Sequence, residues 1–373
     1  MKIFIFQNSP APFRTPLFIK LGEKFETTVV YGLKNARDRY GNAGVAGYTH
    51  DFLKGVNIAL KGKTLTYARG LGRYLRDHDF DVYIINDDWR CGLSNRAIVR
   101  AARRRGRPVF LWCGEIDTPY RFKVMIPNTF RIIYNLHMRR LVKKMSAFLA
   151  YGPKTLRYYE RTYRIPKEKF ICGTQAVALD PDGPVPTKTT VPEVVTFLFI
   201  GYLEQRKGVH DLIRAARQLD RDDLRLIIAG KGPEEERLKN MAEGDCRIEF
   251  RGYVEGAEKR KCYREADVMV SPTYHDPWAN TINEACVYGL PIITTPAEGA
   301  EGSLALDGFN ARIVPPGDID KLRGALEFFL ENKSAIPAMG KKSKALGEKF
   351  NIGWVVENFA RAVQIALRDK QDD

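Results

Sequence analysis

The segment DPWANTINEACVYGLPIITT, residues 276–295, sets two carboxylates eight positions apart, Asp276 and Glu284, just before a glycine and an apolar run. Residues 280–288 favour a helix, and Gly289 suits the left-handed position at a helix C-terminus. Glu284 is then inside the helix and Asp276 in the loop before it. The free N–H groups of a helix N-terminus, beside two carboxylates that accept hydrogen bonds from hydroxyls, describe a site for a sugar phosphate.

A second motif follows an apolar strand upstream. FLFIGYLEQRKGV, residues 197–209, places Gly201 directly after the strand and the pair Arg206 and Lys207 just before the next predicted helix. Ligands of doubly wound sheets bind at the carboxyl ends of the strands, and two cations near a helix N-terminus suit a diphosphate. Taken alone, these charges also fit a solvated loop.

The sequence resembles the retaining GT-B glycosyltransferases of the GT4 family, also described as glycosyl transferases group 1. The resemblance rests on the spaced carboxylates followed by Gly-Leu-Pro, on the segment 197–209 and on IAGKGP at 228–233. It is strong over about residues 194–335, and in the N-terminal half it covers only the general layout. It implies two Rossmann-like domains facing a central cleft and a nucleoside-diphosphate sugar as donor.

The resemblance also assigns roles to residues. Lys207 matches the family's phosphate-binding lysine, and Arg206 is the expected replacement for the arginine that usually stands where this chain has Tyr202. Glu284 is implied to bind the ribose hydroxyls and Asp276 to lie near the hydroxyls of the transferred sugar. The alternatives are purely structural: Glu284 would be a surface glutamate, and Asp276 a turn or N-cap aspartate. The other residues expected to line the donor site are Gly201, Tyr202, Gly230, Trp278, Ala279, Asn280 and Thr281.

The acceptor side has a weaker pattern. Family members often carry a histidine after the strand equivalent to residues 108–112, but this chain has none there. Glu115 or Asp117 is the candidate to accept or position the proton of the acceptor hydroxyl, with a capping carboxylate as the alternative. Arg14, in the loop after the first strand, is a predicted contact for the diphosphate or the acceptor.

Strand and helix patterns alternate along both halves, which favours an α/β fold with parallel sheets. We expect an N-terminal acceptor-binding domain over residues 1–185, a nucleotide-sugar-binding domain over 186–350, and a terminal helix, 351–373, packing back toward the first domain. Helices are expected, among other places, at 65–77 and 127–145. Predicted strands lie at 3–6, 27–32, 81–86, 108–112, 147–152, 195–200, 224–229, 247–250, 267–271, 291–295 and 311–314.

Charge is unevenly distributed over the 373 residues. Of the formal net charge of +15, residues 1–190 carry +19 and residues 191–373 carry −4. Residues 130–145 form an amphipathic pattern with Arg139, Arg140, Lys143 and Lys144 on one side, and the run RRRGR at 103–107 adds further positive charge. Either this face docks on an anionic membrane surface or it is a solvated helix face.

The sequence therefore predicts a metal-independent retaining glycosyltransferase without a cofactor. Its acceptor is expected to be a glycan or lipid-linked glycan of cell-surface polysaccharide or glycolipid biosynthesis. The six cysteines lack metal-ligand spacing, and no apolar stretch is long enough for a membrane span, so we expect a cytoplasmic protein, peripheral on the cytosolic membrane face if the basic half docks there. A GT-B epimerase or phosphorylase is the alternative. A non-enzymatic basic binding protein leaves the carboxylate pair unexplained, and no aromatic signature indicates nucleic-acid binding.

Overall fold

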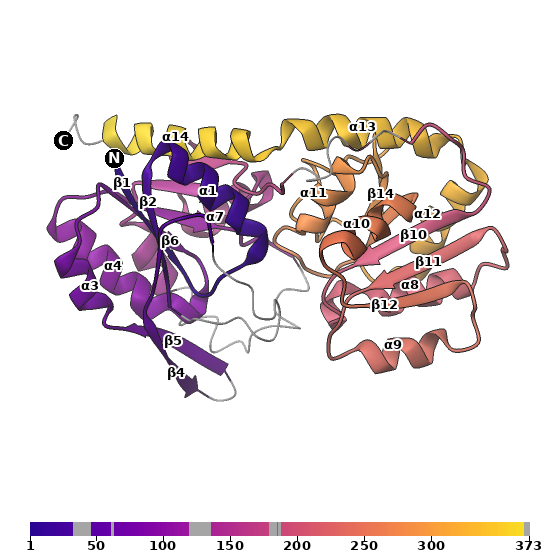
Figure 1. Ribbon diagram of the computed structural model, residues 1–373, viewed down its shortest axis with the longest axis horizontal. Helices are drawn as coiled ribbons and strands as arrows, with labels where there is room; N and C mark the ends of the chain where they lie inside the picture. The colour runs from indigo at the N-terminus through magenta and orange to yellow at the C-terminus, as the bar shows by residue number, and fades with distance from the viewer. Residues whose placement is uncertain (33–45, 61–62, 119–135, 179–184, 186–187, 369–373) are drawn as a thin grey trace. The chain divides into compact units, whose positions relative to one another are not determined.

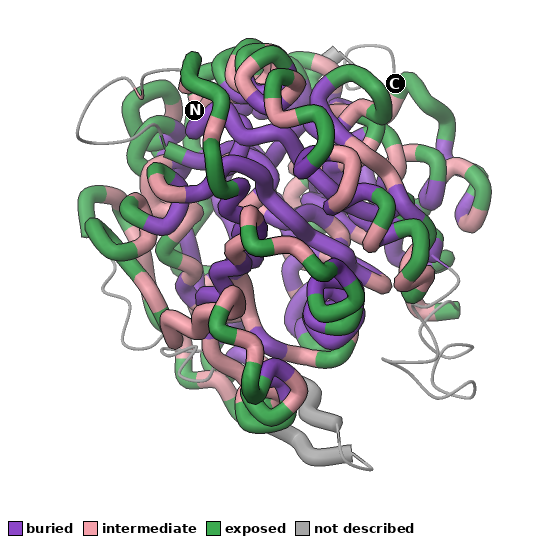
Figure 2. Tube along the Cα trace, turned by 90° about the vertical axis from the view of Figure 1, so that its right-hand side faces the viewer, coloured by how far each residue is buried: buried purple, intermediate pink, exposed green. Residues whose placement is uncertain are grey.

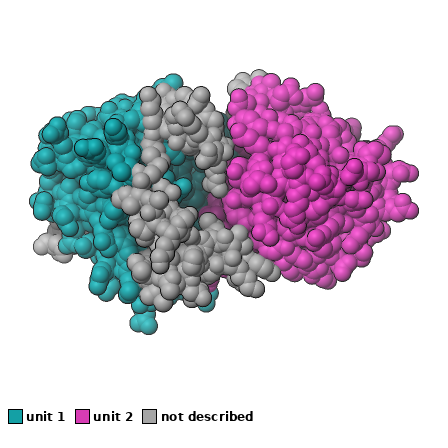
Figure 3. Space-filling view, turned by 90° about the horizontal axis from the view of Figure 1, so that it is seen from below, with its two compact units in different colours: residues 1–116, 126–178, 352–373 teal, residues 117–125, 179–351 magenta. Residues whose placement is uncertain are grey.

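The structure is a computed structural model that describes residues 1–32, 46–60, 63–118, 136–178, 185 and 188–368. It divides into two compact units, shown in Figures 1 and 3. Unit 1 comprises residues 1–116, 126–178 and 352–373, and unit 2 comprises residues 117–125 and 179–351.

Two details of this division differ from the sequence-based boundaries. Unit 1 gives way to unit 2 after residue 178 rather than 185, and residues 117 and 118 belong to unit 2 rather than to the N-terminal domain. The second difference has a visible cause. The hydroxyl of Thr118 forms a hydrogen bond of 3.0 Å with Nδ1 of His275, and both side chains are buried.

Within the described residues, unit 1 holds a seven-stranded parallel sheet in the order β3-β2-β1-β6-β7-β8-β9. The order reverses between β1 and β6, as in doubly wound folds. The strands are β1 (Lys2–Gln7), β2 (Glu26–Tyr31), β3 (His50–Phe52), β6 (Val82–Asn86), β7 (Val109–Cys113), β8 (Ala147–Ala150) and β9 (Phe170–Cys172).

Helices cover both faces of this sheet, because side chains of each buried strand alternate between them. Phe4 and Phe6 of β1 pack toward α3 (Leu71–Asp77), α4 (Gly92–Arg104) and α7 (Pro153–Tyr163). Ile3 and Ile5 pack toward α1 (Thr15–Lys24) and α14 (Ile352–Arg368), so the last helix completes the core of unit 1. Figure 2 shows the buried residues along the inside of the trace and exposed residues on the outer turns.

The helix expected at 65–77 is wrong in its first part. Residues Lys63–Arg69 form β5, which pairs antiparallel with β4 (Lys54–Leu60), and the helix α3 begins only at Leu71. The run Thr-Leu-Thr-Tyr favours a strand, since β-branched and aromatic residues pack well on a pleated surface. Gly70, with φ +86°, then turns the chain into α3.

The basic helix expected over 127–145 is described only in part. A helix covers residues 136–142, with Met138 and Leu141 buried, whereas residues 127–135, including Phe130 and Tyr134, lie outside the described residues. The side chains of Arg139, Arg140, Lys143 and Lys144 are exposed.

The other basic run, 103–107, is partly engaged in local structure. Nη1 of Arg105 donates to the carbonyl of His78 at 2.9 Å, and Nη2 of Arg107 lies 2.9 Å from the Asp79 carboxylate. These two arginines therefore hold the end of α4 to the segment before β6.

Within its described residues, unit 2 holds a six-stranded parallel sheet in the order β12-β11-β10-β13-β14-β15. The strands are β10 (Val195–Ile200), β11 (Leu224–Ala229), β12 (Ile248–Gly252), β13 (Val268–Ser271), β14 (Ile292–Thr294) and β15 (Ala311–Ile313). The helices are α8 (Val209–Arg217), α9 (Glu235–Ala242), α10 (Gly256–Glu265), α11 (Asn280–Val287), α12 (Ile319–Glu331) and α13 (Ala335–Lys349).

The core of unit 2 forms where the apolar strands meet these helices. Leu212 of α8, Leu238 of α9 and Leu326 of α12 are buried against one face of the sheet. Gly289 has φ +65° after α11, as the sequence predicts. Among the described residues, no helix has both the length and the apolar character required to cross a membrane.

Candidate active site

The loops after β10 and β11 pack backbone against backbone. The Gly201 N–H donates to the carbonyl of Ala229 at 2.9 Å, and the Leu203 N–H donates to the carbonyl of Lys231 at 2.9 Å. Gly230 has φ +148°, and a Cβ atom there would lie 1.8 Å from the Gly201 carbonyl oxygen. Only glycine fits position 230, which explains the glycine in the motif that the sequence singles out.

Arg206 and Lys207 lie on a short 3-10 helix, Gln205–Lys207, that leads into α8 through Gly208. Gly208 has φ +71°, and a Cβ atom there would lie 2.1 Å from the carbonyl oxygen of Pro272. The Arg206 carbonyl also accepts a hydrogen bond of 2.8 Å from the Tyr274 N–H. The loop after β10 is thereby joined to the loop after β13.

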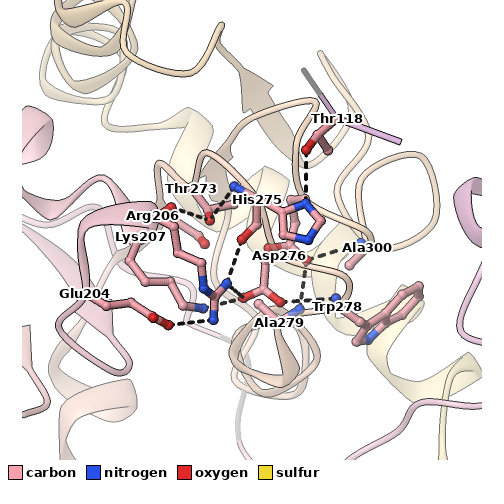
Figure 4. A network of polar contacts seen from close by, with 12 residues as sticks. Thr118, Glu204, Arg206, Lys207, Thr273, His275, Asp276, Trp278, Ala279 and Ala300 are labelled. Carbon is pink, nitrogen blue, oxygen red and sulfur yellow. Dashed lines mark hydrogen bonds and ion pairs between the residues drawn. The ribbon is translucent and has the colours of Figure 1, made fainter. Parts of the chain in front are cut away.

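Arg206, Lys207 and Asp276 meet at this junction (Figure 4). The Lys207 ammonium forms an ion pair with Oδ2 of Asp276, and Nη1 of Arg206 lies 3.7 Å from the same oxygen. Arg206 also donates to the carbonyl of His275 at 2.6 Å and pairs with Glu204 at 2.7 Å. Three of the four residues predicted to be catalytic are therefore side by side in unit 2, and the fourth, Glu115, lies in unit 1.

Electrostatics keeps this cluster charged although its side chains are largely buried. Burial alone would raise the pKa of the Asp276 carboxyl, but the Lys207 ammonium and the Arg206 guanidinium outweigh burial and hold its pKa well below its usual range. Burial by itself lowers the pKa of Arg206. The negative charges of Asp276 and Glu204 oppose burial and together raise the pKa above its usual value. Asp276 is an acceptor-only carboxylate at neutral pH.

The residues after Asp276 form the entrance to α11. The Trp278 N–H donates to Oδ1 of Asp276 at 3.2 Å, and the indole N–H of Trp278 donates to Asn283 at 2.7 Å. Trp278 and Ala279 are buried. Asn280 and Thr281, which begin the helix, are half-buried.

Glu284 lies apart from this cluster. Its two carboxylate oxygens contact α10, where the Lys259 ammonium lies 2.5 Å from Oε1 and the Tyr263 hydroxyl donates to Oε2 at 2.6 Å. Burial and the adjacent Glu284 raise the pKa of Tyr263 well above its usual range. Glu284 is thus a partly buried, paired carboxylate and not a surface glutamate.

The acceptor-side candidate Glu115 lies in unit 1, after β7. Its N–H and that of Gly114 donate to Oδ2 of Asp87 at 3.1 and 2.9 Å, and the Tyr159 hydroxyl donates to the same oxygen at 3.1 Å. Burial raises the pKa of Asp87, and these hydrogen bonds oppose the shift. Asp87, which the sequence did not single out, therefore positions the loop that carries Glu115.

Arg14 is also in unit 1 and is held by groups at three strand ends. Its Nη2 donates to the Tyr151 hydroxyl at 2.8 Å, its Nη1 donates to Oε1 of Gln7, and the guanidinium lies 4.3 Å from the ring centroid of Trp112. Burial raises the pKa of Tyr151 to about 12. Among the described residues, no carboxylate pairs with Arg14 within 4.0 Å, so the charge of its guanidinium has no anionic partner there.

Sequence reasoning missed Glu298, which is fully buried next to the Asp276 backbone. It lies in the loop after β14, the strand beside β13. The rule that placed the other site residues, namely that ligands bind where parallel strands end, also applies to this loop and would have found it.

Comparisons with known proteins agree with this architecture. Residues 188–349 match the family model described as glycosyl transferases group 1. The uncharacterized glycosyltransferase MJ1607 of Methanocaldococcus jannaschii is 33% identical over 110 residues, 27% of each chain. The phosphatidyl-myo-inositol mannosyltransferase of Mycobacterium leprae is 31% identical over 172 residues, 43% of this chain and 46% of the relative. The chain thus spans less than half the length of these two relatives.

Two solved structures have the same fold over nearly their whole length. Anabaena HepE in complex with UDP is 15% identical, with a TM-score of 0.76 over 98% of this chain and 100% of that chain. The apo form of the lipopolysaccharide outer core galactosyltransferase WaaB is 16% identical, with a TM-score of 0.73 over 97% and 99%. These likenesses confirm two Rossmann-like units of the GT-B class. Residues 188–349, less than half of the chain, are thus similar to the glycosyl transferases group 1 family.

Proposed function

We propose that this protein is a retaining glycosyltransferase of the GT4 type that moves a sugar from a nucleoside-diphosphate sugar to a glycan or lipid-linked acceptor. The observation that carries the proposal is the junction of Arg206, Lys207 and Asp276 at the ends of two adjacent strands of unit 2. Cations and a carboxylate in one strand-end site match a donor that has both phosphates and hydroxyls.

The chemistry assigns different tasks to these groups. As the bond between the sugar carbon and the diphosphate breaks, negative charge grows on the departing phosphate, and a preorganised cation lowers the energy of that state. Lys207 is suited to this task because its ammonium has three donors, of which Asp276 needs one. Asp276 is left to accept hydrogen bonds from the sugar. In this proposal the acceptor hydroxyl attacks on the face that the diphosphate leaves, and no metal takes part.

The named relatives support the choice of substrates. HepE was crystallised with UDP and with UDP-glucose, the M. leprae relative is a phosphatidyl-myo-inositol mannosyltransferase, and WaaB is a lipopolysaccharide galactosyltransferase. From these relatives we infer that the present protein uses a nucleotide-sugar donor and an acceptor of cell-surface polysaccharide or glycolipid biosynthesis.

The proposal is tested with a panel of UDP, GDP, ADP and their sugars. A ligand at 100 times its dissociation constant stabilises the fold by about 2.7 kcal/mol, so thermal unfolding identifies the donor. Products are then analysed with and without acceptor, and with EDTA. Release of nucleoside diphosphate with acceptor-dependent, EDTA-resistant sugar transfer supports the proposal. An epimerised donor, or transfer to inorganic phosphate, would replace it with an epimerase or phosphorylase.

A further inference from the structure

Glu298 has a location that the proposed chemistry does not use. Glu298 is completely buried in the loop after β14, and its backbone runs parallel to that of Asp276. The Asp276 N–H donates to the Ala297 carbonyl at 3.0 Å, and the Gly299 N–H donates to the Asp276 carbonyl at 2.8 Å. The loop of Glu298 therefore supports the donor-site carboxylate from behind.

The Glu298 side chain reaches the entrance of α11. Its Oε1 accepts hydrogen bonds from the Ala279 N–H at 2.8 Å and the Ala300 N–H at 3.3 Å. Ala279 is the N-cap residue of α11, which has no capping side chain of its own. Glu298 thus accepts from the N-cap N–H, the role that the glutamate of a capping box fills from within its own helix.

The charges around Glu298 decide which form of its carboxyl is stable. Asp276 is the acidic neighbour, and Lys207 and Arg206 are the cations that interact with Glu298. Burial, with Asp276 next in effect, raises the pKa of Glu298 from its ordinary 4.5 to about 8, against the two backbone N–H groups and Lys207. Asp276 takes the ionised form and Glu298 the neutral form, as expected when two carboxyl groups share one site.

We propose that Glu298 is a positioning residue of the donor site: as a neutral acid it holds Asp276 and the N-terminus of α11 in place, and its ionisation weakens binding of the nucleoside diphosphate. This inference rests on the proposed function. An ionised Glu298 adds a second negative charge beside Asp276, where the charge of Lys207 and Arg206 is already partly neutralised. The diphosphate is itself anionic, so its affinity is expected to fall when Glu298 loses its proton.

The test measures the affinity for UDP, or for GDP or ADP if one of these binds more tightly, from pH 6 to pH 9. Three chains are compared, namely the wild type, Glu298→Gln and the control Glu258→Gln, which changes an exposed carboxylate on α10. Glutamine keeps an acceptor for both N–H groups and cannot ionise. Between pH 7 and pH 9 we expect wild-type affinity to fall about 3- to 10-fold and that of Glu298→Gln to change by less than about twofold. The control should follow the wild type.

Parallel pH curves in wild type and Glu298→Gln would overturn the inference, because the nucleotide's own ionisation is common to both. Loss of binding by a folded Glu298→Gln at every pH would also overturn it, since the neutral isostere must replace a neutral acid. A wild type that binds no nucleoside diphosphate contradicts the proposed function instead.

The protonation state of Glu298 is tested separately by measuring the free energy of unfolding against pH without nucleotide. Because the folded pKa lies above the unfolded one, the proton stabilises the folded state fully below pH 4.5, and this stability is lost as the pH rises through about 8. The stability of the wild type relative to Glu298→Gln must therefore decrease between pH 6 and pH 9. A constant difference would refute the neutral form.

Discussion

Arg206 and Lys207 are neighbours in the chain but are held in different ways. Arg206 binds the His275 carbonyl, Glu204 and Asp276, whereas the Lys207 side chain pairs with Asp276. A guanidinium with several fixed partners is part of the framework of the site. An ammonium on a flexible stem adjusts to a ligand more readily.

This difference predicts that Arg206→Ala acts on stability. Removing the guanidinium leaves Glu204 and the buried Asp276 with less compensation, and breaking a buried ion pair costs about 3–5 kcal/mol. Chemical denaturation should show this loss, while Lys207→Ala should lose clearly less, because Glu204 and the His275 carbonyl keep their contacts with Arg206. Equal losses in the two variants would show that Arg206 is not the main support.

The two carboxylates of the motif should separate in binding experiments. Glu284→Gln is expected to weaken the affinity for the free nucleoside diphosphate by about tenfold, since a lost charged acceptor costs about 1.5 kcal/mol or more, whereas Asp276→Asn should act mainly on the nucleotide sugar. Because Glu284 also pairs with Lys259, the control is Lys259→Gln. If Lys259→Gln or Asp276→Asn lowers the affinity for the nucleoside diphosphate as much as Glu284→Gln does, Glu284 does not bind the ribose.

Among the elements, the strand-end loops are fitted to each other through glycine. Gly299 is an example without unusual φ, where a Cβ atom would lie 1.7 Å from the carbonyl oxygen of Pro277. Such contact cannot be relieved without moving the loop that carries Asp276. The loops after β13 and β14 thus form one structure, which is consistent with the hydrogen bonds between Asp276, Ala297 and Gly299.

Gly299→Ala is therefore expected to destabilise the protein by about 1–3 kcal/mol or more, the usual cost of overpacking. Gly324→Ala is the matched control, because that glycine lies within α12 and a Cβ atom there meets nothing within 4 Å. Alanine should be neutral or favourable by about 0.5–1 kcal/mol at such a helix position. Similar unfolding midpoints for the two variants would contradict the close fit of the loops.

At this scale the sequence predicts much of the structure, for physical reasons. Apolar runs bounded by Gly, Pro or charges identify the long buried strands, and the helix before Gly289 has a clear end signal. The hairpin β4–β5 is missed, because β5 is separated only by Gly70 from the helix α3, so that the pattern of the two together predicts one helix. Contacts between elements that are distant along the chain are also invisible in the sequence: neither the pair of Glu284 with Lys259 nor the hydrogen bond of Glu298 with Ala279 follows from spacing.

For the whole molecule, the uneven charge is the feature that the site leaves unexplained. The N-terminal 190 residues carry +19, and the helix over 136–142 with the residues after it exposes Arg139, Arg140, Lys143 and Lys144. We propose that this basic face docks on anionic lipid, which would bring a lipid-linked acceptor to the enzyme. Each cation near an anionic surface contributes about 1 kcal/mol.

Reversing these four charges should release the protein from anionic liposomes in a sedimentation assay. Binding should also weaken with salt, because the Debye length is only about 8 Å at physiological ionic strength. The matched control reverses four exposed lysines of unit 2, Lys239, Lys261, Lys321 and Lys341. Equal binding to neutral and anionic vesicles, or equal loss in both variants, would refute the membrane surface.

The central claim is that the strand-end site of unit 2 binds the diphosphate of the donor. Calorimetric titration of the nucleoside diphosphate selected by the panel into wild type, Lys207→Ala and Lys321→Ala, an exposed control on α12, tests it most directly. We predict that Lys207→Ala remains folded and binds about 10- to 100-fold more weakly, the scale of a lost charge-assisted hydrogen bond, whereas the control binds as the wild type does. Unchanged affinity in a folded Lys207→Ala protein would contradict the account.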